Sequence, residues 1–523
     1  MNDTSFVEAV SLWVRQFSAS HANQRVKMNS QFLFGVPKSR AIPSFVYLIL
    51  STTFLIFLIP LGRYPLPYID ESFYNYPAIR YLEGHGFIYH VSSTAPYADK
   101  LWANHAPFFP RMQITTFRLL GKNQFAMRAP DYIFAYLALF LICSFLMRRK
   151  LFWAALAVAV VWVGDRSTQE VLLGRMEGVA LFFVVLGFCA LIITLEQETP
   201  MACLACGAAL GLAIGFHPVT ALFFIASAMV LVVSASPIWR WRALFSFAAG
   251  AMLPAFLWLL CWWPDLGASY EQFQHNLKAA TVHTLCDKLL NLVRVLRWSR
   301  WWLISLCLVV AGYLLPLAIW FLYRRRNAGL RESPHALWLV ACLFSVVGLI
   351  ALLTKAVFPY YLVYFTIWPT VALAVQLETK AGRQFRVWTC AAYLIVILGW
   401  LPSFLWNGLR AREALLYFHR LDHRRVIRQL QSVIPAHTKV VCEPIMFMIA
   451  QEAGLDYEPV AWFAEQTKPP PEVWLLVTKA EWLQPHYLSP EAIRSRRIVI
   501  ECDGFFKKEA PSEKYIVLGP AVN

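Results

Sequence analysis

The sequence predicts a polytopic α-helical membrane protein that carries a small α/β domain near its C-terminal end. Hydrophobic residues make up 59% of the 523 residues, charged residues make up only 15%, and the mean hydropathy is +0.51. Soluble domains carry about 25% charged residues, so this composition excludes an ordinary soluble fold. Long apolar segments recur along most of the chain, and short strand-like segments follow them.

About eleven apolar segments reach or approach the length of about 20 residues that crosses a bilayer. They begin near Ile42, Asp131, Leu151, Gly178, Met201, Val219, Ala243, Trp301, His335, Val357 and Val387. The segment Met201–Phe216 is the weakest candidate because it is short and rich in glycine. Residues 1–41 lack the charged start and cleavage site of a signal peptide, so we expect Ile42–Leu61 to remain as a span. We therefore predict a cytoplasmic segment at residues 1–41 and a transmembrane domain at residues 42–407.

Basic residues in short loops mark the cytoplasmic side of a membrane protein. Here they gather on alternating turns, at Lys38, Arg40, Arg148–Lys150, Arg240, Arg242, Arg324–Arg326, Lys380, Arg383 and Arg386. With the N-terminus inside and an odd number of spans, the large loop 62–130 and the C-terminal region lie outside. Arg294, Arg297 and Arg300 depart from this pattern, and their spacing of three favours a basic helix face along the membrane.

The net charge of +16 does not indicate nucleic-acid binding, because the basic clusters serve topology and could meet anionic lipid head groups. Most of the 11 cysteines lie inside apolar segments, where a cysteine behaves as a small hydrophobe. Cys203 and Cys206 form a CxxC without a second pair, so we expect no metal site there. The sequence leaves open whether Cys442 and Cys502 form a disulfide.

The chain changes character after Asn407, and we predict an extracytoplasmic α/β domain at residues 408–523. Leu421–Ile434 has the pattern of an amphipathic helix that ends at Pro435. Strand-like runs follow at Lys439–Cys442, Val473–Val477, Ile498–Cys502 and Tyr515–Leu518, with a helix expected after the first. No glycine-rich phosphate loop is present, so the pattern does not support nucleotide binding.

An acidic pair, Asp70 and Glu71, stands in the first outer loop shortly after the first apolar segment, with Tyr74 close behind. A carboxylate at the membrane boundary could deprotonate an acceptor while the lipid phase delivers the second substrate. The alternative is that the two acids only solvate a loop.

Further polar residues fall at the outer ends of predicted spans, and they are His105, Arg128, Arg175, Glu177, Lys355, Tyr360 and Tyr361. Each also has an ordinary explanation, such as a turn histidine, a snorkelling arginine or interfacial tyrosines. Arg175 and Glu177 are two positions apart and would not share a helix face, which favours separate partners. For His217 we favour simple packing. Because the others all map to one side of the membrane, we predict one site for an anionic substrate.

The run Asp70-Glu-Ser-Phe-Tyr74, followed by Ala78, Leu82, Gly84 and Gly86, resembles the signature of the GT-C-type glycosyltransferases that use polyprenyl phosphate. Within them it is most similar to the bacterial branch related to protein O-mannosyltransferases and the lipid A aminoarabinose transferase. Further motifs occur in the family's order, at Asn104–Pro107, Leu120–Gly121, Met127–Pro130, Gly174–Glu177 and Lys355–Tyr361. The resemblance covers about residues 42–400.

The resemblance implies inverting transfer of a sugar from a polyprenyl-phosphate donor, with Asp70 as the base and Glu71 beside it. The resemblance also implies that four residues contact the donor or its phosphate, namely His105, Arg128, Arg175 and Lys355. Four others are expected to position the substrate, namely Tyr74, Glu177, Tyr360 and Tyr361. His105 departs from relatives of the aminoarabinose-transferase type, which carry lysine there, and Arg128 or Lys355 could compensate.

The expected partners are a polyprenyl-phosphate sugar, an acceptor that is a glycolipid, a polysaccharide or a protein, and membrane lipids, with no nucleic acid. The expected place is the bacterial cytoplasmic (inner) membrane, with the site facing outside. The sequence decides neither the sugar nor whether a divalent metal is needed.

Two other functions compete with transfer. A transporter or flippase of lipid-linked sugars usually has polar residues near the bilayer midplane and inverted repeats. This chain has no visible repeat, and its polar residues cluster at span ends. A glycan ligase that uses a lipid pyrophosphate is the other alternative, and the early Asp-Glu motif argues against it.

Overall fold

The computed structural model describes most of the chain from Ala41 onward, in residues 41–62, 70–89, 97, 100–103, 106–165, 171–234, 237–281, 284, 286–287, 290, 301–325, 333–354, 359–379, 386–417, 423–460, 468–485, 488–502 and 515–521. The chain divides into two compact units, Met1–Ile42 and Pro43–Asn523. All contacts discussed below lie within the second unit.

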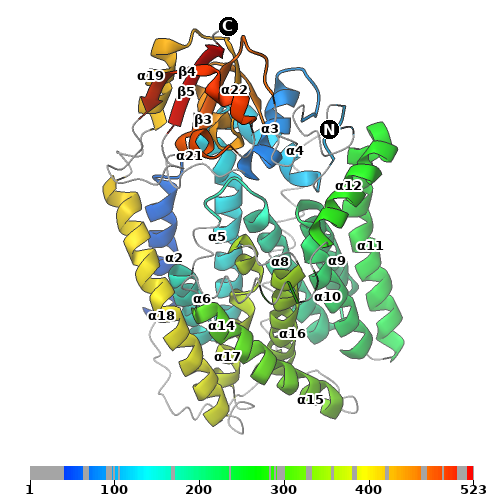
Figure 1. Ribbon diagram of the computed structural model, residues 1–523. Helices are drawn as coiled ribbons and strands as arrows, with labels where there is room; N and C mark the ends of the chain where they lie inside the picture. The colour runs from blue at the N-terminus through cyan, green and yellow to red at the C-terminus, as the bar shows by residue number, and fades with distance from the viewer. Residues whose placement is uncertain are drawn as a thin grey trace. The chain divides into compact units, whose positions relative to one another are not determined.

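Apolar helices make up most of the structure (Figure 1). They are α2 (Ala41–Leu58), α5 (Gln124–Arg148), α6 (Phe152–Gly164), α8 (Glu177–Gln197), α9 (Pro200–Phe216), α10 (Ala221–Ser234), α11 (Pro237–Trp262), α14 (Trp301–Val309), α15 (Leu315–Arg325), α16 (Ser333–Thr354), α17 (Ile367–Glu378) and α18 (Arg386–Tyr417). A π-helical turn, η3 (Val310–Leu314), joins α14 to α15, and short 3₁₀ turns, η1 (Pro218–Thr220) and η4 (Pro359–Tyr364), precede α10 and α17. Each of the eleven predicted apolar segments overlaps one of these helices.

Six helical stretches among the described residues are long and apolar enough to cross a membrane, and four more are apolar but shorter. The six are Gln124–Arg148, Glu177–Gln197, Trp239–His275, Trp301–Trp320, His335–Leu353 and Arg386–Arg412. Large apolar side chains on α11 and α18 are exposed, among them Phe245 at 72% and Val387 at 79%. Such exposure of large hydrophobes is expected where the surrounding solvent is lipid.

Two helices of the predicted loop 62–130, α3 (Asp70–Leu82) and α4 (Phe108–Leu120), precede α5. The start of α5 corrects the predicted loop 62–130, because the helix begins at Gln124 rather than near Asp131. Asn123 caps it, with a side chain that accepts a hydrogen bond from Ala126 N–H at 2.9 Å. Arg128 is therefore inside the first turns of the helix.

The C-terminal α/β region, residues 423–521, contains a five-stranded sheet of order β2-β1-β3-β5-β4. Its strands are β1 (Lys439–Cys442), β2 (Asp456–Pro459), β3 (Trp474–Thr478), β4 (Arg496–Cys502) and β5 (Tyr515–Ala521). β2, β1 and β3 are parallel, whereas β5 runs antiparallel to both of its neighbours. Its helices are α19 (His423–Val433), α20 (Phe447–Glu452), which follows the 3₁₀ turn η6 (Pro444–Met446), α21 (Lys479–Leu483) and α22 (Pro490–Arg494).

Each face of this sheet contributes to its own hydrophobic core. On β3, Leu476 belongs to a cluster with α19 and α20, whereas Leu475 belongs to a second cluster with Leu488 and Ile493. The first cluster also includes residues of α3, α4 and α5, so this core continues beyond the C-terminal α/β region.

Two details of the predicted tail are corrected. Helix α18 continues to Tyr417, so the predicted boundary at residue 407 falls inside a helix. The disulfide that the sequence left open is excluded, because β3 and β5 lie between the strands of Cys442 and Cys502. Three strand spacings of about 4.8 Å separate these two strands by about 14 Å, more than a disulfide spans.

Candidate active site

Helix α3 presents two different faces because successive helical residues point about 100° apart. Asp70, Glu71 and Tyr74 lie on one side of this helix, and Tyr76 and Ile79 lie on the other. Asp70 is the first helical residue, and its side chain is 18% exposed, whereas the side chain of Glu71 is 0% exposed. Only the first of the two adjacent carboxylates therefore reaches solvent.

Glu71 forms a fully buried ion pair with Arg128 of α5. Arg128 donates from Nε to Glu71 Oε1 at 2.8 Å and from Nη2 to Oε2 at 3.2 Å, and both side chains are 0% exposed. The Gly174 N–H also donates to Glu71 Oε1, at 2.9 Å. This forked, charge-assisted geometry fixes the start of α3 against α5 and the segment before α8. It gives Arg128 a role in holding Glu71, which differs from the predicted phosphate contact.

Arg175 lies between two carboxylates. Its Nη1 donates to Asp70 Oδ2, and its Nη2 and Nε donate to Glu177 Oε1 at 2.7 and 3.2 Å. The side chains of Arg175 and Glu177 are only 1% and 2% exposed. The guanidinium also lies over the ring of Tyr74, with Cζ 5.1 Å from the ring centroid. One buried cation thus orients the carboxylate of Asp70 and neutralises part of the local negative charge.

The pairing of Arg175 with Glu177 shows that our prediction of separate partners was wrong. The helix-face argument does not apply, because Arg175 lies in the turn before α8 and Glu177 is the first residue of that helix. Two flanking glycines allow this turn to lie close to α5. A Cβ on Gly178 would stand 2.2 Å from the Asp131 carbonyl oxygen, and one on Gly174 would stand 2.7 Å from the Met127 side chain.

Tyrosines extend the cluster. Tyr361 is 2% exposed and is close enough to Tyr74 and Asp70 to interact with them electrostatically. The ring of His217 packs against the ring of Tyr361, with the two centroids 5.2 Å apart. Tyr360 is in the same 3₁₀ turn, η4, but its side chain is outside the described part. The predicted donor contacts His105 and Lys355 also fall outside the described residues.

Sequence reasoning missed two residues that hold this arrangement. Asp131 is fully buried, and its Oδ1 accepts hydrogen bonds from the N–H groups of Gly178 and Val179 at 2.6 and 3.2 Å, at the start of α8. Asn75 donates to the carbonyl groups of Glu71 and Gly174, both at 2.7 Å. An acid within a predicted apolar span was a signal, because such residues are rare unless they have a specific partner.

Asp70 is the acid of this cluster that is open to the surroundings of the site. The cluster combines three carboxylates, of Asp70, Glu71 and Glu177, with the two guanidiniums of Arg128 and Arg175. Only Asp70 among the three acids is both paired and partly open to solvent. Among the residues that the structure describes, no group of three or more histidines, cysteines or acids could hold a metal ion.

The fold resembles known structures, although no protein-family model and no curated protein matches the sequence. Crystal structures of ArnT from Cupriavidus metallidurans match 91% of this chain and 98% of their own chain, with a TM-score of 0.54. One is bound to undecaprenyl phosphate and is 11% identical, and the other is in the apo state and is 12% identical. At this identity the similarity establishes a shared fold, which confirms the predicted GT-C-type resemblance at that level.

Proposed function

We propose that this chain is a membrane glycosyltransferase that moves a sugar from a polyprenyl-phosphate donor to an acceptor at the outer face of the membrane. The observation that carries the proposal is the partly exposed carboxylate of Asp70, held by the buried Arg175 in a cluster of acids. The fold shared with ArnT bound to undecaprenyl phosphate supports a lipid-phosphate donor here.

In the proposed reaction Asp70 takes the proton from the acceptor hydroxyl as its oxygen attacks the anomeric carbon. The bond between that carbon and the phosphate oxygen breaks, and polyprenyl phosphate leaves with the bonding electrons. Attack opposite to the leaving group inverts the anomeric centre. The acceptor is a glycolipid, a polysaccharide or a protein, and the sugar is a hexose or a pentose.

The other residues divide into two groups. Arg175, Glu177 and Tyr74 orient the base, and the buried pair of Glu71 and Arg128 fixes the helix that carries it. His105 and Lys355 stay in the proposal as donor-phosphate contacts on the strength of their sequence motifs, together with the positioning tyrosines Tyr360 and Tyr361.

The test begins with the lipid that accumulates when the gene is deleted, because it identifies the donor. That lipid is then supplied to the full chain reconstituted in vesicles, together with an extract of cell-envelope glycans. A transferase releases polyprenyl phosphate and yields an acceptor that carries the sugar. A flippase would move the intact lipid-linked sugar across the bilayer without cleavage, and that result would overturn the proposal.

A further inference from the structure

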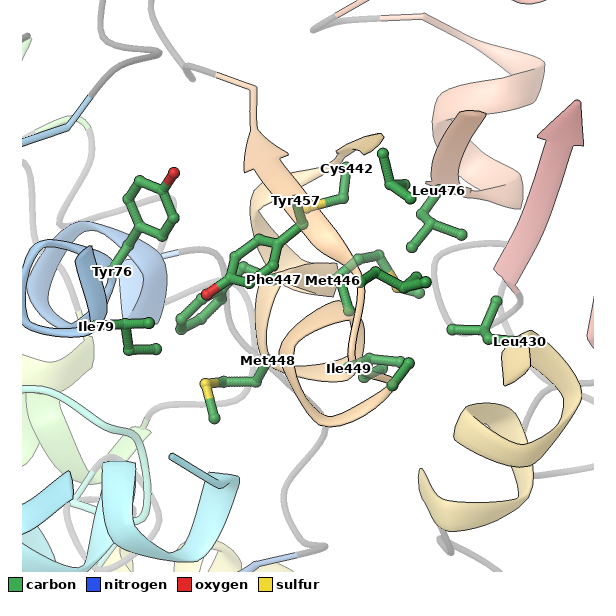
Figure 2. Close-up of a cluster of buried hydrophobic side chains, with 14 of the residues drawn as sticks. Tyr76, Ile79, Leu430, Cys442, Met446, Phe447, Met448, Ile449, Tyr457 and Leu476 are labelled. Atoms are coloured by element: carbon green, nitrogen blue, oxygen red, sulfur yellow. The ribbon is translucent and has the colours of Figure 1, made fainter. Parts of the chain in front are cut away.

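The face of α3 that points away from the site is buried against the C-terminal α/β region. Tyr76 and Ile79 are both 0% exposed and belong to one hydrophobic cluster with Phe447 and Met448 of α20 (Figure 2). The ring of Tyr76 packs edge-on against that of Tyr457 on strand β2, with the centroids 5.7 Å apart. The helix that carries Asp70 is therefore sandwiched between the candidate site and the C-terminal α/β region.

This contact is buried on both sides, with Tyr76 0% and Tyr457 6% exposed. Burial raises the pKa of the Tyr76 hydroxyl far above its usual range, because a buried phenolate would lose its solvation. The ring of Tyr76 also meets Tyr89 at 5.3 Å, so it is held from two sides. Protein interiors are close-packed, so a displacement of Tyr457 would be transmitted through Tyr76 and would shift α3.

A second contact reaches the other helix of the site. Glu452, the last residue of α20, accepts a hydrogen bond at its Oε1 from the backbone N–H of Gln124 at 2.9 Å. Gln124 is the first residue of α5, whose early N–H groups have no partner within the helix. A carboxylate at a helix N-terminus is favoured electrostatically. Arg128, which holds Glu71, is only about one turn further along this helix.

We infer that the C-terminal α/β region positions the catalytic carboxylate, with Tyr457 acting on α3 and Glu452 acting on α5. Both are positioning residues, because Tyr457 contacts Tyr76 of α3 and Glu452 contacts the Gln124 N–H of α5. This inference rests on the proposed function in taking Asp70 as the base. According to this inference, the C-terminal α/β region contributes to turnover and is not only attached to the membrane domain.

The second core of the same sheet provides a control. Leu475 on β3 is 0% exposed and belongs to the cluster on the opposite face, which includes no residue of α3 or α5. Leu475→Ala should destabilise the C-terminal α/β region as Tyr457→Ala does, since both empty a buried site. Only Tyr457→Ala removes the ring that packs against Tyr76.

The experiment compares Tyr457→Ala, Tyr457→Phe and Leu475→Ala in the full chain reconstituted in vesicles, with rates expressed per folded protein. We expect Tyr457→Ala to lower kcat by about ten- to a hundredfold, because misplacement of a reacting group by about 1 Å has an effect of this size. The KM for the donor should stay unchanged. Tyr457→Phe keeps the ring and should restore most of the turnover.

A second readout needs no activity. Amide hydrogen exchange in α3 should be faster in Tyr457→Ala than in Leu475→Ala, because only the former loosens this helix. Equal kcat in the two alanine variants, or equal exchange in α3, would overturn the inference. Absence of transfer by the unaltered chain would instead overturn the proposed function, and the exchange comparison would still decide whether the C-terminal α/β region holds α3.

The contact of Glu452 supplies an independent pair of variants. Glu452→Gln keeps a side-chain oxygen that can accept from Gln124, whereas Glu452→Ala leaves that N–H without this acceptor. We expect kcat to fall in the alanine variant and to recover in the glutamine variant, again without a change in the KM for the donor. An alanine variant with unaltered kcat would remove α5 from the inference.

Discussion

Asp70 and Glu71 are adjacent in the chain, but solvent reaches only the first of the two carboxylates. Glu71 is enclosed by Arg128 and the Gly174 N–H, whereas Asp70 is 18% exposed and meets Arg175. Adjacent helical residues point about 100° apart, which is enough to separate the two environments. Glu71 therefore anchors α3, and Asp70 is the carboxylate for which we propose proton transfer.

Removal of Arg128 should destabilise the protein strongly. Arg128→Ala leaves the buried carboxylate of Glu71 without its counter-charge, and breaking a buried pair in this way costs about 3–5 kcal/mol. Arg128→Lys should rescue only in part, since a lysine lacks the forked donors. The midpoint of thermal unfolding in detergent measures the effect. Lys468→Ala is the control, because the side chains of its pair with Glu491 are 74% and 82% exposed and the pair should contribute at most about 1 kcal/mol. Equal losses for Arg128→Ala and Lys468→Ala would contradict this account.

Arg175→Lys should lower turnover while the protein stays folded. A lysine keeps the positive charge between Asp70 and Glu177 but cannot donate in a fixed fork to both. We expect a decrease in kcat of about ten- to a hundredfold, the range for a misaligned reacting group. Steady-state kinetics together with the unfolding midpoint separate this from misfolding. Loss of activity that only parallels loss of folded protein would assign Arg175 to the fold alone.

At the scale of residues, sequence reasoning located the acids and arginines of the cluster but not all of their pairings. Charged residues at the ends of apolar segments are conspicuous, which is why Asp70, Arg128 and Arg175 could be singled out. The pairing of Arg175 with Glu177 depends on where α8 begins, and the role of Asp131 depends on how α5 and α8 pack. Both depend on tertiary structure that no local pattern encodes.

At the scale of elements, the strands β1, β3, β4 and β5 overlap the predicted runs, whereas β2 was not predicted. The sequence Asp456-Tyr-Glu-Pro459 is short and contains residue types that are depleted in strands. It becomes a strand because it pairs in parallel with β1. Similarly, α18 continues beyond the apolar run because residues such as Leu409 and Arg412 are good helix formers.

The C-terminal α/β region should become more stable as the pH falls below neutrality. Burial raises the pKa of the Glu443 carboxyl from 4.5 to about 7, and the Thr478 N–H, which donates at 2.8 Å, opposes this effect only in part. Between pH 4.5 and about pH 7 the Glu443 carboxyl holds its proton in the folded state and has lost it in the unfolded state. The free energy of unfolding therefore decreases as the pH rises through this range. One pKa unit corresponds to about 1.4 kcal/mol, which gives a change of up to about 3 kcal/mol.

Amide exchange of β1 and β3 at pH 5.5 and pH 8 measures this dependence. Glu443→Gln should remove most of it, since burial also raises the pKa of the Glu452 carboxyl in the same region. The variant should stabilise these strands at the higher pH, because no buried charge has to form at this position. Glu458→Gln on β2 is the control, since Glu458 is exposed and should leave the dependence intact. A pH dependence of undiminished size in Glu443→Gln would show that another group is responsible.

At the scale of the whole molecule, composition and the run of apolar segments were sufficient to predict a polytopic helical protein. Every predicted segment overlaps an apolar helix, and the fold is shared with ArnT over most of the chain. The number of spans does not follow from the segments alone. Helices such as α6 and α9 are apolar but shorter than a typical span, and their neighbours decide whether they cross.

Reporter fusions test the predicted orientation. The basic residues on alternating turns predict that a fusion after Lys150 reports the cytoplasm and that a fusion after Tyr417, where α18 ends, reports the outside. The same orientation puts Asp70 at the outer face. Fusions that report the same compartment would contradict both the orientation and the outer site.

The central claim is that Asp70 accepts the acceptor's proton, and the most direct test is the turnover of Asp70→Asn in reconstituted vesicles. Asparagine preserves the size of the side chain and much of its hydrogen bonding but cannot take the proton. We expect transfer from the polyprenyl-phosphate sugar to fall by about 10²–10⁴-fold, the usual contribution of acid–base catalysis. Donor binding, measured separately, should survive. Glu83→Gln, which alters a partly exposed acid just beyond α3, should retain activity. Near-normal transfer by Asp70→Asn would contradict the claim.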